Sequence, residues 1–274
     1  MSQTEQLNTK FMSDGYFIAD NIVSEKKIDT FLENIFKIYC KYNPLTKMLE
    51  LKNPWHTDLF HDELIRFRKS DPKRFSLLYD TAQTSISLLD LVYDEIIVNT
   101  AAKLLNSSST ELSATDGMVR MDAPLDKRNI AGWHQEISYL HNDGLVVWIP
   151  LSDITAELGP LQICPKSHLE GELKVVKQTD LPSDVSTVSI DEIKAENLEK
   201  YSITPVEIKK GDALFFHTSL FHSSGVNKSN KFRLSCQTRY TPSTAENFIP
   251  FRQTKTYSKI GLEFTGKKTS FPTY

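Results

Sequence analysis

Three potential metal ligands are split between two distant parts of the chain, and this split restricts the fold more than any other feature. His134 and Glu136 are two residues apart, while His222 follows far downstream. Residues i and i+2 of a β-strand point to the same face, so we expect His134 and Glu136 to point into one cavity. His222 must then come from another strand, which antiparallel pairing in a barrel brings close. Two imidazoles and one carboxylate are the ligands of a facial-triad iron(II) site, which keeps positions open for a co-substrate and oxygen.

A cationic residue follows the second histidine at a spacing that suits such a co-substrate. Residues 223–230 are rich in turn formers, and residues 232–240 alternate between two sets of side chains, which is typical of a strand. Arg233 and Ser235 therefore share one face. A guanidinium group binds a carboxylate through two parallel hydrogen bonds. We predict that these two residues hold a carboxylate of a 2-oxo acid.

Helical patterns fill the first part of the chain, and strand patterns fill the rest. Ser24 is a candidate helix cap, and Asp71 with the proline after it begins a helical stretch that continues through Leu105 with a break near Thr84. From Gly117 onward, short apolar runs alternate with turn residues. These runs are 118–121, 144–151, 173–176, 203–208, 213–217 and 232–240. We predict a mainly β protein, a double-stranded β-helix (jelly-roll, cupin-like barrel) with the N-terminal helices packed on its outer face.

Several short segments agree in order and spacing with one known family. They are residues 13–17 (SDGYF), 132–136 (GWHQE), 147–151 (VWIPL), 159–168 (GPLQICPKSH), 211–212 (GD), 222–227 (HSSGVN) and Arg233. In these segments the chain resembles the phytanoyl-CoA dioxygenase family of iron(II)- and 2-oxoglutarate-dependent oxygenases. The resemblance implies that His134, Glu136 and His222 bind iron(II), that Arg233 binds the distal carboxylate of 2-oxoglutarate, and that O2 is consumed. The family's usual carboxylate ligand is Asp, so Glu136 departs from the pattern by one methylene.

Four more side chains are candidates for lining or supporting the same pocket. Arg120 lies on the strand before the site and can meet an anionic ligand, although a structural ion pair is an equal alternative. Trp148 is expected in the core or the cavity wall. Gln162 points away from its two apolar neighbours, and His168 shapes a turn or binds the substrate. All four positions are read from the strand and turn patterns around them.

The length and the texture of the chain indicate one domain over residues 1–274. We expect a helical part at about 1–115, a barrel at about 116–242 and a C-terminal tail over 243–274. Residues 178–201 form a long polar insertion between strands, and long insertions are often lids over a site. A solvated surface loop is the alternative.

Composition excludes several classes of protein. The net charge is only −3 and no long basic run is present, so we do not expect nucleic acid binding. The three cysteines are widely spaced, which does not fit a zinc finger or a disulfide scaffold. The polar first residues and the lack of a long apolar stretch predict a cytoplasmic protein without a membrane span. A small-molecule substrate is the expected partner, and the oligomeric state is not predicted.

These observations predict a dioxygenase that hydroxylates a small-molecule metabolite or biosynthetic intermediate and releases succinate and CO2. Three alternatives stay open. The chain is a binding barrel without turnover, it is a cupin-like metalloenzyme that uses no 2-oxo acid, or it catalyses desaturation, cyclisation or epimerisation at the same kind of site.

Overall fold

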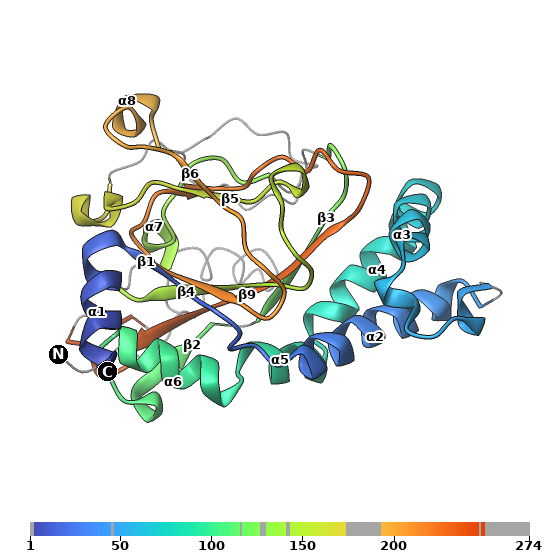
Figure 1. Ribbon diagram of the computed structural model, residues 1–274, viewed down its shortest axis with the longest axis horizontal. Coiled ribbons are helices and arrows are strands. Elements are labelled where there is room, and N and C mark those ends of the chain that lie inside the picture. Colours follow the sequence, from blue (N-terminus) through green and yellow to red (C-terminus); the bar gives the residue numbers. More distant parts are fainter. Residues whose placement is uncertain are drawn as a thin grey trace, which may run out of the picture.

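The structure is a computed structural model in which residues 3–44, 47–115, 117–126, 130–140, 143–173, 193–246 and 248–249 are described. Helices occupy the first part of the chain and strands the second (Figure 1). The α-helices are α1 (Gln3–Asp14), α2 (Glu25–Tyr42), α3 (Asp58–Ser70), α4 (Pro72–Gln83), α5 (Ile86–Val92), α6 (Glu95–Leu104), α7 (Ile137–Leu140) and α8 (Ala195–Leu198). The strands are β1 (Tyr16–Ala19), β2 (Leu112–Ala114), β3 (Met118–Asp122), β4 (Leu145–Pro150), β5 (Leu161–Ile163), β6 (Thr204–Val206), β7 (Ala213–His217), β8 (His222–Ser223) and β9 (Arg233–Pro242).

Local signals begin and end several helices as predicted. The Ser24 side chain accepts a hydrogen bond from the Lys27 amide at the start of α2, and Asp71 does the same for Arg74 at the start of α4. The predicted break falls between α4 and α5, where the Ser85 side chain caps the second helix. A side-chain oxygen at each of these positions satisfies an amide that has no partner within its helix.

The strands form two antiparallel sheets. The larger sheet has six strands in the order β1-β7-β4-β9-β2, and β3 also pairs with β9. The smaller sheet has the order β6-β5-β8. One apolar cluster contains Val146, Trp148 and Phe216 of the larger sheet together with Ile163 and Val206 of the smaller sheet. The two sheets therefore pack face to face.

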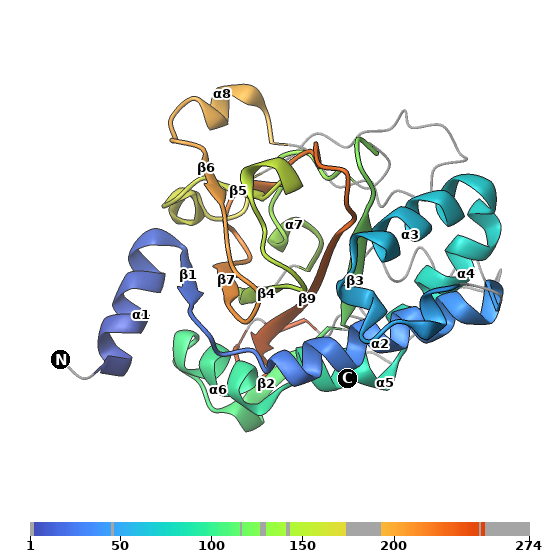
Figure 2. The same ribbon diagram turned by 45° about the vertical axis from the view of Figure 1, so that its right-hand side comes forward.

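The outer face of the larger sheet is covered by α2–α6 (Figures 1 and 2). Alternate residues of β4, such as Val147 and Ile149, are buried there against Phe31 and Ile35 of α2. The other residues of β4 face the smaller sheet. This alternation separates an outer core, between helices and sheet, from an inner core between the two sheets.

Strand β9 differs from its neighbours on the inner face. Its outward residues, Leu234, Cys236 and Tyr240, join the outer core. The residues between them are polar and belong to the inner face, because Arg239 pairs with Val146 and Gln237 with Trp148 of β4. This inner row consists of Arg233, Ser235, Gln237 and Arg239.

The free edge of β3 is covered by a side chain from α4. The Gln83 carboxamide donates to the Val119 carbonyl and accepts from the Val119 amide, both at 2.8 Å. It therefore provides one donor and one acceptor, as a neighbouring strand does.

Two sequence expectations need correction. His134 pairs with His222 through a single antiparallel bridge, and Glu136 begins a turn into α7 rather than continuing a strand. Leu173 lies outside any strand, and the rest of the run expected over 173–176 is outside the described residues, as is most of the insertion over 178–201. The end of that insertion is described, and Ile193 donates its amide to the Trp133 carbonyl. None of the described helices is long and apolar enough to span a membrane.

Candidate metal centre and co-substrate site

The two histidines meet because their backbones pair directly. The His134 amide donates to the His222 carbonyl at 3.0 Å, and the His222 amide returns a bond to the His134 carbonyl at 3.1 Å. Their ring centroids are 4.1 Å apart. His222 also pairs with Ile163 of β5, whose side chain belongs to the inner core. The predicted convergence of His134 and His222 is thus present.

Each imidazole is held in one orientation by a backbone carbonyl two residues earlier. His134 Nδ1 lies 2.8 Å from the Gly132 oxygen, and His222 Nδ1 lies 2.9 Å from the Leu220 oxygen. A carbonyl only accepts hydrogen bonds, so Nδ1 carries the proton in both rings. Burial, followed by the neighbouring His134, lowers the pKa of His222 to about 4. In neutral His222, Nε2 therefore presents a lone pair.

Glu136 faces both Nε2 atoms and is also gripped by an arginine. Its Oε1 lies 3.8 Å from His134 Nε2 and 3.5 Å from His222 Nε2. Arg239 donates from Nε to Oε2 at 2.8 Å and from Nη2 to Oε1 at 3.0 Å. Burial alone raises the pKa of Glu136, but the charge and the hydrogen bonds of Arg239 hold it well below its usual value.

We call the site on the inner face of the larger sheet the inner site. One end of it consists of His134, Glu136, His222 and Arg239, and we call these four residues the acceptor-rich end. The three ligand atoms lie within 4.8 Å of one another and all three residues are buried. An imidazole that directs Nδ1–H to a carbonyl offers the lone pair of Nε2 to a metal ion, and a carboxylate offers an oxygen. The donor set of two nitrogens and one oxygen is that of a facial-triad iron(II) site. The residues present therefore fit a divalent metal.

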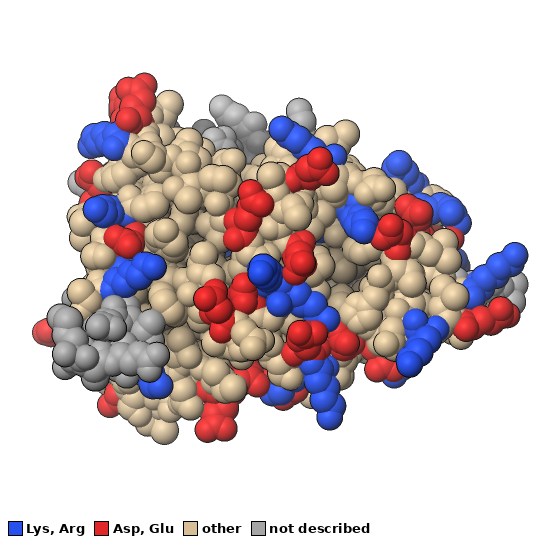
Figure 3. Space-filling model, viewed as in Figure 1, with Lys and Arg blue, Asp and Glu red and all other residues tan. Residues whose placement is uncertain are grey.

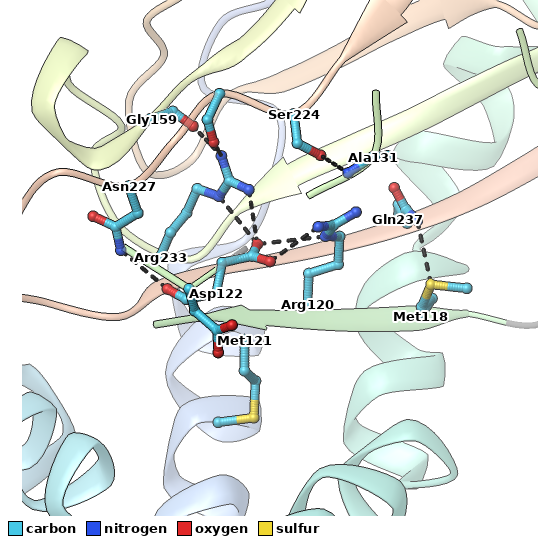
Figure 4. Close-up of polar contacts among 12 residues, drawn as sticks. Met118, Arg120, Met121, Asp122, Ala131, Gly159, Ser224, Asn227, Arg233 and Gln237 are labelled. Atoms are coloured by element: carbon cyan, nitrogen blue, oxygen red, sulfur yellow. Dashed lines mark hydrogen bonds and ion pairs between the residues drawn. The ribbon is translucent and has the colours of Figure 1, made fainter. Parts of the chain in front are cut away.

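A second cluster lies at the other end of the β9 inner row. Asp122 and Arg233 are opposite each other in the β3–β9 ladder, as are Arg120 and Ser235. Arg120 and Arg233 both donate to the Asp122 carboxylate, at 2.9 Å from each Nη2 (Figure 4). Burial raises the pKa of Asp122, but Arg120 and then Arg233 lower it below its usual value. We call Arg120, Asp122, Arg233 and Ser235 the donor-rich end.

Arg233 is more tightly engaged than the sequence predicted. Its Nη1 donates to the Gly159 and Gly225 carbonyls, while Nε and Nη2 donate to Asp122. A guanidinium group has five N–H bonds, and four of them are used in these contacts. One N–H of Nη2 is left for a ligand, so Arg233 does not offer the two-pronged contact that was expected of it.

The Ser235 hydroxyl points to a missing partner. The side chain is fully buried, and its oxygen has no hydrogen bond among the described residues. An unsatisfied buried hydroxyl is costly. It lies opposite Arg120 in the β3–β9 ladder. A carboxylate ligand would accept a hydrogen bond from this hydroxyl beside a guanidinium group.

Of the remaining candidate residues, one lies on the inner face and two point away from the metal ligands. Trp148 is on the inner face, opposite Gln237. Gln162 adjoins Ile163, which shares the face of His222, so alternation turns Gln162 away from the metal ligands, toward Ser223. His168 packs below α1, where Nε2 contacts the Met12 carbonyl. The structure does not bring Gln162 or His168 into the inner site.

Gln135, between the two candidate ligands, joins three loop segments. Its side-chain nitrogen donates to the Gly171 and Ser219 carbonyls, both at 2.7 Å, and its oxygen accepts from the Leu173 amide. These contacts turn its side chain away from the metal ligands. These bonds fix the loop on which His134 and Glu136 sit.

Two residues of the site were missed from the sequence, Arg239 and Asp122. A signal for Arg239 was present, because it shares the alternating face of Arg233 and Ser235. Asp122 carried no local signal, since its contact with Arg233 joins residues 111 positions apart and depends on the pairing of β3 with β9.

A sizeable cavity among the described residues lies elsewhere. Its volume is about 500 Å³, and it lies between α2, α3 and the barrel, on the side of Phe232 and Leu234 rather than of Arg233. Its charged groups form pairs, such as Lys210 with Asp29 and Lys231 with Asp58. Charges of both signs are likewise interspersed over the face in Figure 3. The convergence of ligand atoms, and not cavity size, therefore locates the candidate site.

Comparisons with known proteins agree with this geometry. The family model of phytanoyl-CoA dioxygenase (PhyH) matches residues 11–235. A phytanoyl-CoA dioxygenase domain-containing protein 1 homolog of Dictyostelium discoideum is 32% identical over 104 residues, 36% of this chain and 36% of its own length. An L-proline trans-4-hydroxylase of Streptomyces griseoviridis is 28% identical over 121 residues, 37% of this chain and 44% of its own length. The matched segments thus span less than half of these curated relatives.

The fold has solved counterparts. A crystal structure of the epimerase SnoN in complex with Fe3+, alpha-ketoglutarate (2-oxoglutarate) and nogalamycin RO aligns with a TM-score of 0.60 and 16% identity, over 99% of this chain and 92% of that chain. This similarity confirms the predicted jelly-roll fold with N-terminal helices.

Proposed function

Because the chain belongs to the phytanoyl-CoA dioxygenase family, we propose that it is an iron(II)- and 2-oxoglutarate-dependent dioxygenase that hydroxylates a small molecule. One observation carries this proposal. Two buried imidazole nitrogens and one buried carboxylate oxygen converge, and each imidazole directs its Nδ1 proton to a backbone carbonyl instead of to this point. Such an arrangement offers a metal ion three ligand atoms, and iron(II) is the metal that this ligand set suits.

His134, Glu136 and His222 would hold the metal. The carbonyls of Gly132 and Leu220 fix the imidazoles in the ligating tautomer, which is the usual role of such partners. When bound, iron(II) couples the conversion of 2-oxoglutarate and O2 into succinate and CO2 to the insertion of one oxygen atom into a C–H bond of the substrate. The protein positions the reactants and excludes water.

The donor-rich end would hold the far carboxylate of 2-oxoglutarate. Ser235 would donate its unpartnered hydroxyl, Arg233 its remaining N–H, and Arg120 its charge. Asp122 keeps the two guanidinium groups side by side, which offsets their mutual repulsion. Cα atoms of Arg233 and Arg239 are about 20 Å apart along β9, and long side chains from both ends reach inward, so a five-carbon diacid fits between them.

The substrate would enter beside Trp148, whose ring is on the inner face of β4. The similarity to an L-proline trans-4-hydroxylase makes free amino acids the first compounds to screen. We propose that residues 1–274 act as one domain, with the helical layer as a support for the barrel.

The decisive test measures succinate. Anaerobic protein is loaded with iron(II) and 2-oxoglutarate, exposed to O2, and assayed for succinate with and without each candidate substrate. We expect succinate release that a true substrate accelerates, and a product that gains one oxygen atom. Metal binding without any succinate would favour a non-catalytic barrel, and substrate turnover without 2-oxoglutarate would favour a cupin-like enzyme. A product with an unchanged formula would indicate epimerisation, and one that loses two hydrogens would indicate desaturation or cyclisation.

A further inference from the structure

We propose that Arg239 is a positioning residue that limits Glu136 to one metal-ligating oxygen, an inference that rests on the proposed function. Both side chains are buried, and Arg239 contacts both carboxylate oxygens of Glu136. Oε1 lies 3.8 Å from His134 Nε2 and 3.5 Å from His222 Nε2, while Oε2 accepts the bond from Arg239 Nε at 2.8 Å. The bond from Arg239 Nε therefore directs Oε2 toward β9.

Glu136 is one methylene longer than aspartate, and this extra reach explains why the contact with Arg239 matters. Glu136 begins the turn into α7, so its backbone position is fixed by the His134–His222 bridge on one side and the helix on the other. From there its carboxylate spans the gap between the imidazoles and Arg239 on β9. A glutamate without such a partner has the reach to bind a metal through both oxygens. The arginine removes that option by a two-pronged, charge-assisted contact.

Arg239 and a metal ion would share one carboxylate, so their positive charges oppose each other. Without the metal, the guanidinium group compensates the buried charge of Glu136, whose pKa it holds low. With the metal, it withdraws electron density from the ligand and repels the ion. Loss of a partner that only orients a ligand weakens metal binding. Loss of Arg239 should instead strengthen it, because a competing cation disappears and the second oxygen becomes available.

The test compares wild type with Arg239→Gln and Arg239→Lys by anaerobic titration with iron(II), and with Co(II) as a spectroscopic probe. We expect Arg239→Gln to bind either metal at least tenfold more tightly. Its Co(II) absorption should weaken in the visible range, as a rise in coordination number requires. Arg239→Lys keeps the charge without the fork, so its affinity and spectrum should lie between those of the other two proteins.

Equal affinities with the same Co(II) spectrum would overturn the proposal, and so would weaker binding by Arg239→Gln, since that result assigns Arg239 an orienting role only. If Arg239→Gln does not fold, the spectrum of Arg239→Lys decides, and an unchanged spectrum overturns the proposal.

Arg68→Gln is the matched control, because it removes another arginine, partly buried, that pairs with a carboxylate, Asp126. Its metal affinity and Co(II) spectrum should equal those of wild type. Wild type that binds neither metal would reject the proposed function itself. Normal binding by wild type with unaltered Arg239 variants would reject only the role of Arg239.

Discussion

The two ends of the β9 inner row contain the same kind of ion pair, but the groups around the two pairs suit ligands of opposite charge. Each has a buried arginine bound to a buried carboxylate, Arg239 with Glu136 and Arg233 with Asp122. At the acceptor-rich end, two imidazole nitrogens add lone pairs to the carboxylate. At the donor-rich end, a second arginine and an unpartnered hydroxyl add donors.

The difference shows how one strand prepares for two ligands of opposite charge. At the acceptor-rich end Arg239 balances the charge of Glu136, and the two added imidazole nitrogens suit a cation. At the donor-rich end two guanidinium groups and a hydroxyl surround one aspartate, and these donors suit an anion. A diacid that binds a metal through one end and an arginine through the other meets both requirements.

The largest effect is expected when a metal ligand of the acceptor-rich end is removed. His222→Ala should lower the affinity for iron(II) by more than about 100-fold, because it removes a ligand rather than a supporting partner. Anaerobic metal titration measures this, with His61→Gln as the control for loss of a partly buried histidine outside the site. Unchanged affinity in both His134→Ala and His222→Ala would show that the histidines bind no metal.

The pH dependence of stability tests the role of His61, a histidine that lies next to the donor-rich end. His61 accepts a hydrogen bond from the Phe232 amide, next to Arg233, and burial with the nearby Lys231 lowers its pKa to about 4 from 6.5. Between these values the unfolded chain binds a proton that the folded protein does not. Stability should therefore be full above pH 6.5 and fall as the pH approaches 4, by on the order of 3 kcal/mol for this group.

His217, whose pKa is also lowered to about 4 by burial, contributes in the same pH window. The measurement is therefore the difference between wild type and His61→Gln in urea unfolding at neutral and acidic pH. Glutamine keeps an acceptor for Phe232 and does not titrate, so the slope should become shallower. If the unfolding free energy falls equally with acidification in both proteins, His61 does not contribute to the pH dependence of stability.

Arg233→Ala should weaken 2-oxoglutarate binding while iron(II) affinity stays within a factor of about three. One hydrogen bond to a charged group contributes about 1.5–3 kcal/mol, which corresponds to tenfold or more in the dissociation constant. Arg233→Lys should recover part of this, because lysine keeps the charge but cannot make all of the contacts with Asp122 and the Gly159 and Gly225 carbonyls that hold Arg233 in place. Anaerobic titration of the iron-loaded proteins provides the comparison, and equal constants would separate Arg233 from the co-substrate.

Ser235→Ala sharpens the comparison through two small effects of opposite sign. Removal of a buried hydroxyl without a partner should raise the stability of the ligand-free protein by up to about 1 kcal/mol. The same change should weaken 2-oxoglutarate binding by about threefold to tenfold. Urea unfolding and co-substrate titration measure the two quantities. A loss of stability with unchanged binding would contradict the assignment of this hydroxyl to the co-substrate.

Features that depend on neighbours in sequence were predictable. The caps at Ser24 and Asp71 and the strand Ala213–His217 follow from local patterns, and the structure confirms them. The extended segment expected at His134 was wrong beyond one bridge, because the same two-residue spacing also suits a turn that leads into a helix. Short apolar patterns do not distinguish these cases.

The site was predictable as a set of residue types but not as a network. His134, Glu136 and His222 were identified by their chemistry, and the structure brings them together. The partner of each carboxylate depends on strand register, which places Asp122 opposite Arg233 and Arg239 opposite Val146. Register is a property of the folded sheet, so the engagement of Arg233 by Asp122 could not be read from spacing.

The Gln83 side chain makes protection of the β3 edge depend on the docking of one helix, α4. Its amide occupies the donor and acceptor of Val119 that a foreign strand would otherwise bind. When α4 detaches, β3 becomes a template for self-association between molecules. We expect Gln83→Leu to remain folded yet to form oligomers at mild urea concentrations, which light scattering would detect. The helical layer would then protect the sheet edge from other molecules in addition to supporting the barrel.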